Sequence, residues 1–538
     1  MPVNLRTRLG LLGACALAAA AVAPAGIATA SAHPAARSGA VIPLPPPPSP
    51  GPGRSTGVDP LPGVTRVRAK TQAGSPWEAL AHPPSFNPGA MIQLTNGTVL
   101  VQNQGPKNNG TSYWWRLTPS AKGSYVNGTW SKVASLPSDY APLYFASAVL
   151  PDGRVIIMGG EYNHGKLVWT NRGAIYDPVA NTWTTVKHPK GSEWVRIGDA
   201  PSTVLAGGTF MLGASGYSGT TAEALLNEAK LTWHKTGAGK DDGNGEEGWS
   251  LLPNGDVLTV DTTDAPNTEI YSPSTGSWTS AGDTPASLID GDGEVGPQLL
   301  QPDGSVFATG ATGANAVYNT STGTWSAGPS FPVIGGQQYD VADGPAAVLP
   351  DGDVLVTASP GDYTAPSHVF DFNGSTLTEV ADPPNAANIA SNDVFMMVLP
   401  TGQVLYNDRV GDFVVYNPTG SPNPAWLPSI STVPSTLAAG GSYTLSGKQL
   451  NGLTQGAAYG DDYQDATNYS LVRITNTATG TVTYARSYGM TKMSVAPGVK
   501  SSVNFTLPAT TPTGASTLVV VANGLASAPV NVTVTAGG

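Results

Sequence analysis

The same short phrase occurs seven times along the chain: a hydrophobic run, a turn that contains glycine, and a second hydrophobic run. The turn glycines lie 47 to 56 residues apart, and they are Gly97, Gly153, Gly208, Gly255, Gly304, Gly352 and Gly402. A period near fifty residues, built from strand and turn signals, is typical of a β-propeller with one four-stranded blade per repeat. The repeat therefore predicts a seven-bladed propeller over residues 78–430.

The second repeat shows the blade pattern most clearly. Residues 146–150 are predicted to form the inner strand, residues 151–153 the turn and residues 155–158 the returning strand. An aromatic side chain and a tryptophan recur seven residues apart, as Tyr176/Trp183, Tyr271/Trp278 and Tyr318/Trp325. We expect these rings to pack between neighbouring blades. The fourth strand of the last blade is weak near Ala425-Trp426, and a strand before His82 is the alternative that would complete the blade.

The segments on either side of the repeats differ from them in composition. Arg6 and Arg8 precede an apolar run that ends in small residues at 28–30, which predicts a secretory signal peptide over residues 1–30. Residues 31–75 are rich in Pro, Gly and Ser, and we expect a disordered lead-in there. Residues 431–538 alternate polar and apolar side chains in short runs, which predicts an immunoglobulin-like β-sandwich.

Charge and cysteine content exclude several classes of protein. The chain has 26 basic and 37 acidic residues, a net charge of -11, which argues against nucleic acid and anionic membranes as partners. Cys15 is the only cysteine, and it lies inside the predicted signal peptide. We therefore expect a secreted monomer with no disulfide, no thiol nucleophile and no membrane span.

Two stretches of sequence resemble a known family. The run Leu150–Gly160 with the run Ala174–Thr184 resembles a kelch repeat, and residues 455–473 resemble the C-terminal domain of the secreted galactose oxidase and glyoxal oxidase group. This resemblance implies an all-β fold, a seven-bladed kelch β-propeller followed by an immunoglobulin-like β-sandwich, with a site at one end of the central channel. It also implies an extracellular location.

The resemblance does not extend to the copper radical site of that family. Members that oxidise alcohols or aldehydes bind one copper through two tyrosines and two histidines, and one tyrosine is cross-linked to a cysteine. Here Asn392-Asp393 replaces a Tyr-His pair, Tyr488 is the best match for the C-terminal histidine, and only Tyr144 matches the cross-linked tyrosine. We therefore do not expect copper.

Acidic residues recur at one blade position near the channel. In propellers, the loops before each inner strand and after each second strand open onto one face of the channel. The residue six positions before the end of each inner strand is, in blade order, Pro88, Tyr144, Asp199, Glu246, Val295, Asp343 and Asp393. Glu161, Glu247, Glu294 and Asp340 lie nearby in sequence. This pattern predicts a ring of carboxylates in which some pKa values rise or a cation binds.

Three interpretations of this ring remain open. The carboxylates could form a solvated rim that caps backbone amides in tight turns. They could bind calcium, with Asp290, Asp292 and Glu294 as ligands. They could act as acid and base on a glycan, with these candidate catalytic residues: Asp199, Glu246, Asp343, Asp393 and Glu294. The candidate substrate-binding residues are Tyr140, Tyr144, Trp194, His164 and Glu161.

These observations predict a secreted propeller that binds or processes an extracellular glycan or cell-wall polymer, as a hydrolase or a lyase. Two alternatives remain. The first is a non-catalytic adhesion module of the wall or matrix. The second is a divergent oxidoreductase that lacks the copper-tyrosyl radical centre.

Overall fold

The computed structural model describes residues 74–106, 109–215, 220–410, 412–460 and 468–537. The predicted signal peptide and almost all of the lead-in lie outside the described residues. Strands account for nearly all the regular structure of the described part. Its helical turns are four 3-10 helices, η2 (Ser192–Trp194), η3 (Ala386–Asn388), η4 (Ser391–Asp393) and η5 (Pro424–Trp426). The described part of the chain contains no helix with the length and hydrophobicity needed to cross a bilayer.

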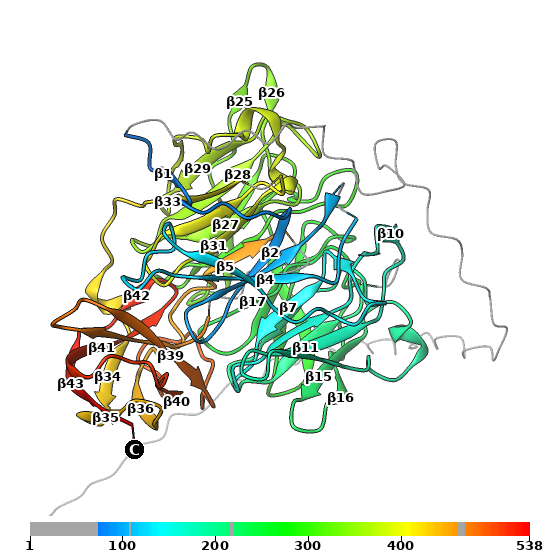
Figure 1. Cartoon of the computed structure of the whole chain (residues 1–538). Coiled ribbons are helices and arrows are strands. Elements are labelled where there is room, and N and C mark those ends of the chain that lie inside the picture. The colour runs from blue at the N-terminus through cyan, green and yellow to red at the C-terminus, as the bar shows by residue number, and fades with distance from the viewer. Residues whose placement is uncertain (1–73, 107–108, 216–219, 411, 461–467, 538) are drawn as a thin grey trace, which may run out of the picture. The chain divides into compact units, whose positions relative to one another are not determined.

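Seven antiparallel sheets of the propeller type follow one another along the chain (Figure 1). Blade 1 contains β2 (Pro88–Gln93), β3 (Val99–Asn103), β4 (Trp114–Thr118) and β5 (Thr129–Lys132). Blade 2 contains β7 (Ala146–Val149), β8 (Val155–Met158), β11 (Gly173–Asp177) and β12 (Thr182–Thr185). Blade 3 contains β13 (Ser202–Val204), β14 (Phe210–Gly213), β15 (Glu223–Asn227) and β16 (Thr232–Thr236). Blade 4 contains β17 (Ser250–Leu251), β18 (Val257–Val260), β19 (Asn267–Ser272) and β20 (Ser277–Asp283). Blade 5 contains β21 (Gln298–Leu300), β22 (Ser305–Thr309), β23 (Asn315–Asn319) and β24 (Thr324–Ala327).

The last two blades borrow strands from elsewhere in the chain. Blade 6 contains β27 (Pro345–Val348), β28 (Val354–Ala358), β29 (His368–Phe372) and β30 (Leu377–Glu379), and β37 (Ala457–Tyr459) adds to its inner edge. Blade 7 contains β31 (Phe395–Val398), β32 (Val404–Asn407) and β33 (Phe413–Tyr416), and its outer strand is β1 (Trp77–Ala79). The strand before His82 thus completes the last blade, whereas residues 424–426 form η5.

The inner strands close into a ring. Consecutive inner strands contact each other from β2 through β31, and β31 contacts β2. The prediction of seven blades is therefore confirmed. The turn glycines explain the regularity, since all seven have φ between +78° and +94°, and each amide donates to the carbonyl oxygen three residues earlier. Glycine adopts this backbone conformation without steric cost.

The predicted aromatic pairs also lie where the repeat placed them. Tyr176 and Trp183 are cross-strand partners, with ring centroids 5.0 Å apart. The indole of Trp183 donates to the carbonyl of Ala134 in blade 1, and that of Trp233 donates to the carbonyl of Lys187 in blade 2. The outer-strand tryptophans therefore join each blade to the preceding one.

The remaining short strands lie in loops between blade strands. The sheet of β6 (Pro142–Leu143), β9 (Tyr162–Asn163) and β10 (Lys166–Leu167) belongs to blade 2, and the hairpin of β25 (Val333–Ile334) and β26 (Gln337–Gln338) lies between blades 5 and 6. They matter here because the predicted site residues Glu161 and His164 flank β9.

The C-terminal strands form a separate sheet (gold to red in Figure 1). Its members are β34 (Ser429–Thr432), β35 (Thr436–Ala438), β36 (Ser442–Lys448), β38 (Leu471–Asn476), β39 (Val482–Tyr488), β40 (Lys500–Thr506), β41 (Gly514–Ala522), β42 (Leu525–Ala526) and β43 (Val530–Thr535). The first half of β39 pairs with β38 and its second half pairs with β40. The all-β class is confirmed, and the immunoglobulin-like assignment stays a prediction.

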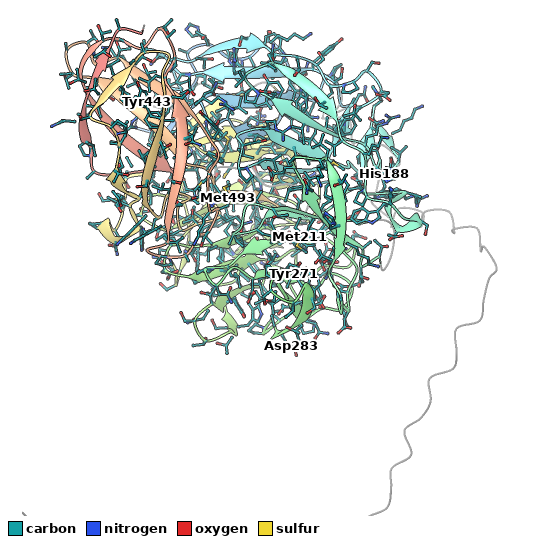
Figure 2. All side chains as sticks on the ribbon, turned by 90° about the horizontal axis from the view of Figure 1, so that it is seen from below. His188, Met211, Tyr271, Asp283, Tyr443 and Met493 are labelled. Atoms are coloured by element: carbon teal, nitrogen blue, oxygen red, sulfur yellow. The ribbon has the colours of Figure 1, made fainter. Side chains whose placement is uncertain are left out.

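The C-terminal residues pack on the end of the propeller that carries the glycine turns. The Met490 amide donates to the Pro151 carbonyl, and the Met493 amide donates to the Ala206 carbonyl, both at 3.0 Å. Met493 lies between the C-terminal sheet, marked by Tyr443, and the propeller (Figure 2). The opposite end, where the inner strands begin, is the channel mouth.

Candidate active site at the channel mouth

A segment of the C-terminal region runs through the channel to the mouth. Strand β37 pairs antiparallel with β27, and Tyr459 lies opposite Pro345, the first residue of β27 (orange beside the blade strands in Figure 1). Gly460 continues this path, since its amide donates to the Gly344 carbonyl at 2.9 Å. We call residues 456–460 the plug. It brings a tyrosine from the C-terminal region to the mouth.

The tyrosine of the plug is Tyr459, not Tyr488. Tyr459 is 1% exposed, and its hydroxyl donates to the Asn392 carbonyl at 2.5 Å. Tyr488 instead lies at the end of β39, where the guanidinium of Arg486 stacks on its ring, 4.5 Å from the centroid. The sequence match of Tyr488 to the family histidine is therefore wrong, because β39 pairs within the C-terminal sheet and does not enter the channel.

A buried arginine organises the mouth. Arg409 follows β32 in blade 7, its side chain is 2% exposed, and its Nη1 donates to Asp393 Oδ1 at 2.7 Å. Its guanidinium lies 5.3 Å from the centroid of the Tyr144 ring, and Nη2 lies 3.5 Å from the Tyr459 hydroxyl. Arg409 thereby connects blade 7, blade 2 and the plug.

Tyr144 lies at the meeting point of three blades. Its side chain is partly exposed, and its ring centroid is 6.0 Å from that of Tyr162 and 6.4 Å from that of Tyr459. Burial raises the pKa of the Tyr144 hydroxyl well above its ordinary value, and Arg409 opposes this rise. The carboxylates of Asp393 and Asp343 raise this pKa further.

Three predicted mouth residues share an unusual backbone conformation. Tyr144, Glu246 and Asp343 have φ of +50°, +59° and +50°, and Arg409 has +59°. Residues with a Cβ rarely adopt this region, and such residues cluster at functional sites. All three precede an inner strand by two to four residues, and each side chain is partly exposed. Arg409 thus joins Tyr144 and Asp393, Asp343 lies against Gly460 of the plug, and blade 4 presents Glu246.

Other predicted residues lie elsewhere. Tyr140 is 1% exposed and donates to the Gly159 carbonyl at 2.8 Å, and Trp194 is 3% exposed in η2 within the core of blades 2 and 3. Neither ring offers an open face to a sugar, because both are covered by protein. Asp199 and Glu294 are 6% and 2% exposed. These two carboxylates are buried where the sequence predicted accessible acids.

The β9–β10 hairpin positions two further candidates. His164 is exposed in the turn between the two strands, and its amide donates to the Ala141 carbonyl. Glu161 is partly exposed, and its amide donates to the Tyr144 carbonyl at 2.9 Å. Glu161 therefore holds the backbone of Tyr144, whereas His164 projects from the surface.

The predicted calcium loop in blade 5 is a capped turn. Asp290 Oδ1 accepts hydrogen bonds from the amides of Asp292, Gly293 and Glu294 at 2.8, 2.9 and 3.0 Å. Within the described ranges, the three-acid groups with ligand atoms inside 4.8 Å of one another do not include this loop. The structure therefore does not assemble Asp290, Asp292 and Glu294 as a metal site, because Asp290 turns inward to cap the loop.

The expected rise in carboxylate pKa values occurs, with burial as its main cause. Burial raises the pKa of Asp340 to about 7, with smaller contributions from Asp362 and Asp290. Burial also raises the pKa of Glu247 to about 8, against the opposing effect of Lys240. Desolvation penalises the charged form of an acid, which is why burial raises both pKa values.

The donor set at the mouth does not suit copper. Tyr144 is surrounded by the Arg409 guanidinium, the Asp393 carboxylate and the Tyr459 hydroxyl. A guanidinium repels a metal cation, and the copper site of the galactose oxidase group includes two histidines, which this set of side chains lacks. The residues present therefore do not fit the copper radical centre of the family that the sequence resembles.

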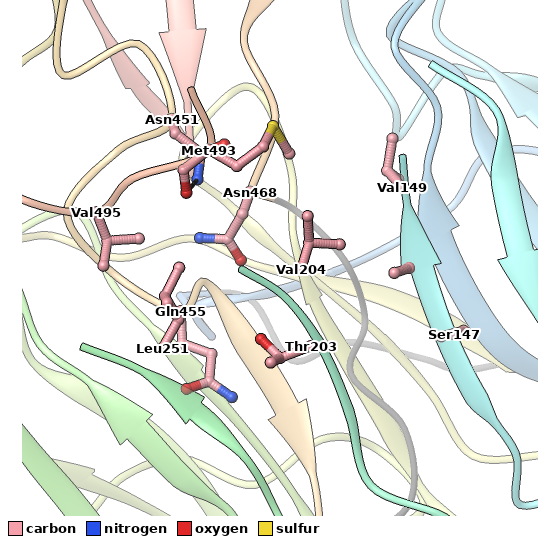
Figure 3. A pocket seen from close by; sticks show the side chains of 11 residues that line it. Ser147, Val149, Thr203, Val204, Leu251, Asn451, Gln455, Asn468, Met493 and Val495 are labelled. Carbon is pink, nitrogen blue, oxygen red and sulfur yellow. Dashed lines mark hydrogen bonds between the residues drawn. The ribbon is translucent and has the colours of Figure 1, made fainter. Parts of the chain in front are cut away.

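A small cavity lies at the other end of the channel. It has a volume of about 50 Å³ and lies between the inner strands of blades 2 to 4 and the C-terminal region (Figure 3). The residues that line it are Ser147, Ala148, Val149, Thr203, Val204, Leu251, Asn451, Gln455, Asn468, Met493 and Val495. This volume suits a few water molecules and not a sugar ring. The mouth is therefore the better candidate for a substrate site.

Comparison with known proteins agrees with the repeat architecture. A curated relative, the Kelch-like protein terF of Aspergillus terreus, is 30% identical over 103 residues, which cover 19% of this chain and 21% of the relative. The chain resembles the galactose oxidase-like kelch propellers. No family model matches it. The chain matches only about a fifth of the length of terF, so the activity of that protein is not transferred.

Two solved structures align with the chain at low similarity. A fungal alcohol oxidase of the AA5 family in complex with copper has 14% identity and a TM-score of 0.48, with 86% of this chain and 99% of that chain covered. The structure of YjhT has 13% identity and a TM-score of 0.39, with 57% of this chain and all of that chain covered.

Proposed function

We propose that the channel mouth binds an extracellular carbohydrate and cleaves it by proton transfer, with Asp343 and Asp393 as the carboxylates. The observation that carries the proposal is the position of Arg409, which lies 5.3 Å from the centroid of the Tyr144 ring and donates to Asp393 at 2.7 Å, while Asp343 lies against Gly460 of the plug. Blades 2 and 6 contribute Tyr144 and Asp343, and blade 7 contributes Asp393 and Arg409. Convergence of acids from separate loops on one partly exposed point is typical of a proton-transfer site.

The four side chains would have different tasks. Arg409 holds Asp393 in one orientation and balances its charge, so this carboxylate is fixed by a buried partner. Asp343 comes from the adjacent blade and is partly exposed at the mouth. One carboxyl would protonate the leaving oxygen, and the second would activate water or attack the sugar. The partly exposed Tyr144 ring offers a surface on which a sugar ring can stack.

The carbohydrate class rests on the resemblance to galactose oxidase-like propellers. The acidic character of the chain, with 37 acidic residues, agrees with an extracellular setting and not with nucleic acid. The same mouth would serve the adhesion alternative without any chemistry. The oxidoreductase alternative would need redox chemistry, and the mouth residues named above include no histidine to bind copper as in the galactose oxidase group.

The test uses the full chain as secreted and a panel of neutral and acidic polysaccharides. Release of new reducing ends or of unsaturated sugars is measured for the wild type, Asp343→Asn and Tyr144→Phe. We expect Asp343→Asn to lower kcat/KM by about 100-fold or more, with the melting temperature nearly unchanged. Asp283→Asn, an exposed acid on β20, is the matched control and should keep full activity.

Each other outcome identifies a different function. Full activity in both mouth variants would refute the site. Saturable binding without product would support the adhesion module, and hydrogen peroxide production would support the oxidoreductase. Activity lost in Glu246→Gln but kept in Asp343→Asn would move the chemistry from blade 6 to blade 4.

A further inference from the structure

A second group of charged side chains is buried in blade 4. It consists of Lys240, Asp242, Glu247, Asp261 and Glu269, which we call the blade 4 acid cluster. These residues come from the loop between β16 and β17, from the loop after β18 and from β19. Each of the five is at most 7% exposed.

One ammonium faces four carboxylates in this cluster. Lys240 Nζ donates to Glu247 Oε1 and to Glu269 Oε2, both at 2.8 Å. Glu269 also accepts the amide of Asp241 at 2.9 Å. Burial of a carboxylate without a compensating charge is costly, so a single lysine leaves the cluster short of positive charge.

Asp261 is the member that the surrounding protein leaves unsatisfied. Its Oδ1 is buried and has no hydrogen-bond partner, and the residue is 2% exposed. By contrast, Asp242 Oδ1 accepts the Gly243 amide at 2.8 Å, and its Oδ2 accepts the Thr263 amide at 3.0 Å. One oxygen atom from each of Asp242, Glu247 and Asp261 lies within 4.8 Å of the other two. Asp261, with its orphaned oxygen, thus belongs to a set of three converging carboxylates.

We propose that Asp242, Glu247 and Asp261 bind one divalent cation, and that this cation is calcium. Three carboxylates supply hard oxygen ligands, and calcium accepts irregular ligand sets drawn from several loops, whereas magnesium demands a near-octahedral arrangement. A carboxylate oxygen has two lone pairs, so oxygens that already accept one hydrogen bond can still bind the ion. Lys240 would keep its hydrogen bonds to Glu247 and Glu269 when the ion is bound.

The position of the site gives the ion a structural task that does not depend on the proposed glycan chemistry. Asp242 and Glu247 lie at the two ends of a six-residue loop, and this loop also carries Glu246 with its left-handed backbone. The hydroxyl of Thr262, next to Asp261, donates to the Gly245 carbonyl at 2.7 Å in the same loop. The bound ion would tie the loop before β17 to the loop after β18 and so fix the blade 4 side of the mouth.

The test measures metal binding by the full chain. The purified protein is analysed for bound metals, stripped with EDTA, and titrated with CaCl₂ and separately with MgCl₂ by calorimetry and thermal unfolding. We expect one calcium per chain, a rise in melting temperature with calcium and weaker binding of magnesium. Asp261→Asn should bind calcium at least about ten-fold more weakly and lose the rise.

The controls separate this site from other acidic surfaces. Asp283→Asn changes an exposed acid on β20 of the same blade, at the edge of the molecule in Figure 2, and should bind calcium like the wild type. Asp242→Asn is the second ligand variant if Asp261→Asn does not fold. Absence of bound metal in the wild type, or unchanged binding in both ligand variants, would overturn the proposal. Loss of binding in Asp292→Asn alone would overturn it as well, and would place the ion in the blade 5 turn.

Discussion

Tyr459→Phe tests whether the plug is held at the mouth by its hydroxyl. The substitution keeps the ring, which packs on Phe395 with centroids 5.1 Å apart, and removes one oxygen atom. That oxygen donates to the Asn392 carbonyl at 2.5 Å and lies 3.5 Å from Nη2 of Arg409. Because Tyr459 is 1% exposed, water does not reach the groups that lose their partner.

The size of the effect follows from this geometry. A buried acceptor that loses its donor costs about 1–3 kcal/mol, and no cavity term is added because the ring remains. We therefore expect the free energy of unfolding to fall by about 1–3 kcal/mol. Equilibrium unfolding in urea, followed by tryptophan fluorescence, measures it as a lower midpoint at an unchanged slope.

The matched control is Tyr113→Phe. Tyr113 is 46% exposed, so loss of its hydroxyl should change the free energy of unfolding by less than about 0.5 kcal/mol. If Tyr459→Phe behaves like this control, the hydroxyl does not hold the plug, and the assignment of Tyr459 as the C-terminal contribution to the mouth fails.

Two further predictions concern stability. Trp77→Ala should lower the free energy of unfolding by about 3–5 kcal/mol, because the buried indole on β1 closes blade 7 and donates to the Ala381 carbonyl. Urea unfolding measures this loss. A loss below about 1 kcal/mol would show that β1 does not close the ring. Burial raises the pKa of Glu223 to about 7, so the stability that this group provides is complete below its ordinary pKa and is lost as the pH rises through 7. As the pH rises from about 5 to about 8, the free energy of unfolding should therefore fall less in Glu223→Gln than in the wild type. Urea unfolding midpoints at each pH measure this difference. An equal fall in both proteins would contradict the raised pKa of Glu223.

The repeat made much of the fold predictable. The seven glycines mark turns that need positive φ, and that requirement is local, so it is visible in the sequence. The aromatic pairs seven residues apart were predictable for the same reason, because a hairpin places them opposite each other. The signal peptide, the secreted location and the glycan partner stay predictions.

The site was predictable only in part. Counting along each repeat found Tyr144, Asp343 and Asp393, since position in a blade determines which end of the channel a residue faces. The same count applied to the ends of the second strands would have found Arg409 and Asp261, which follow β32 and β18. Counting positions does not show how deeply a side chain is buried. Asp199 and Trp194 were therefore expected to be accessible at the mouth, but the structure buries both.

The sequence by itself determined the number of blades, their turns and the end of the channel that collects acidic residues, because these features depend on spacing within a repeat. Only the tertiary structure decided that Tyr459 reaches the mouth, that Arg409 pairs with Asp393, and that three carboxylates of blade 4 converge below the surface. Those contacts join segments separated by up to several blades. Their distances depend on how the blades and the plug pack together, and no local pattern in the chain encodes that packing.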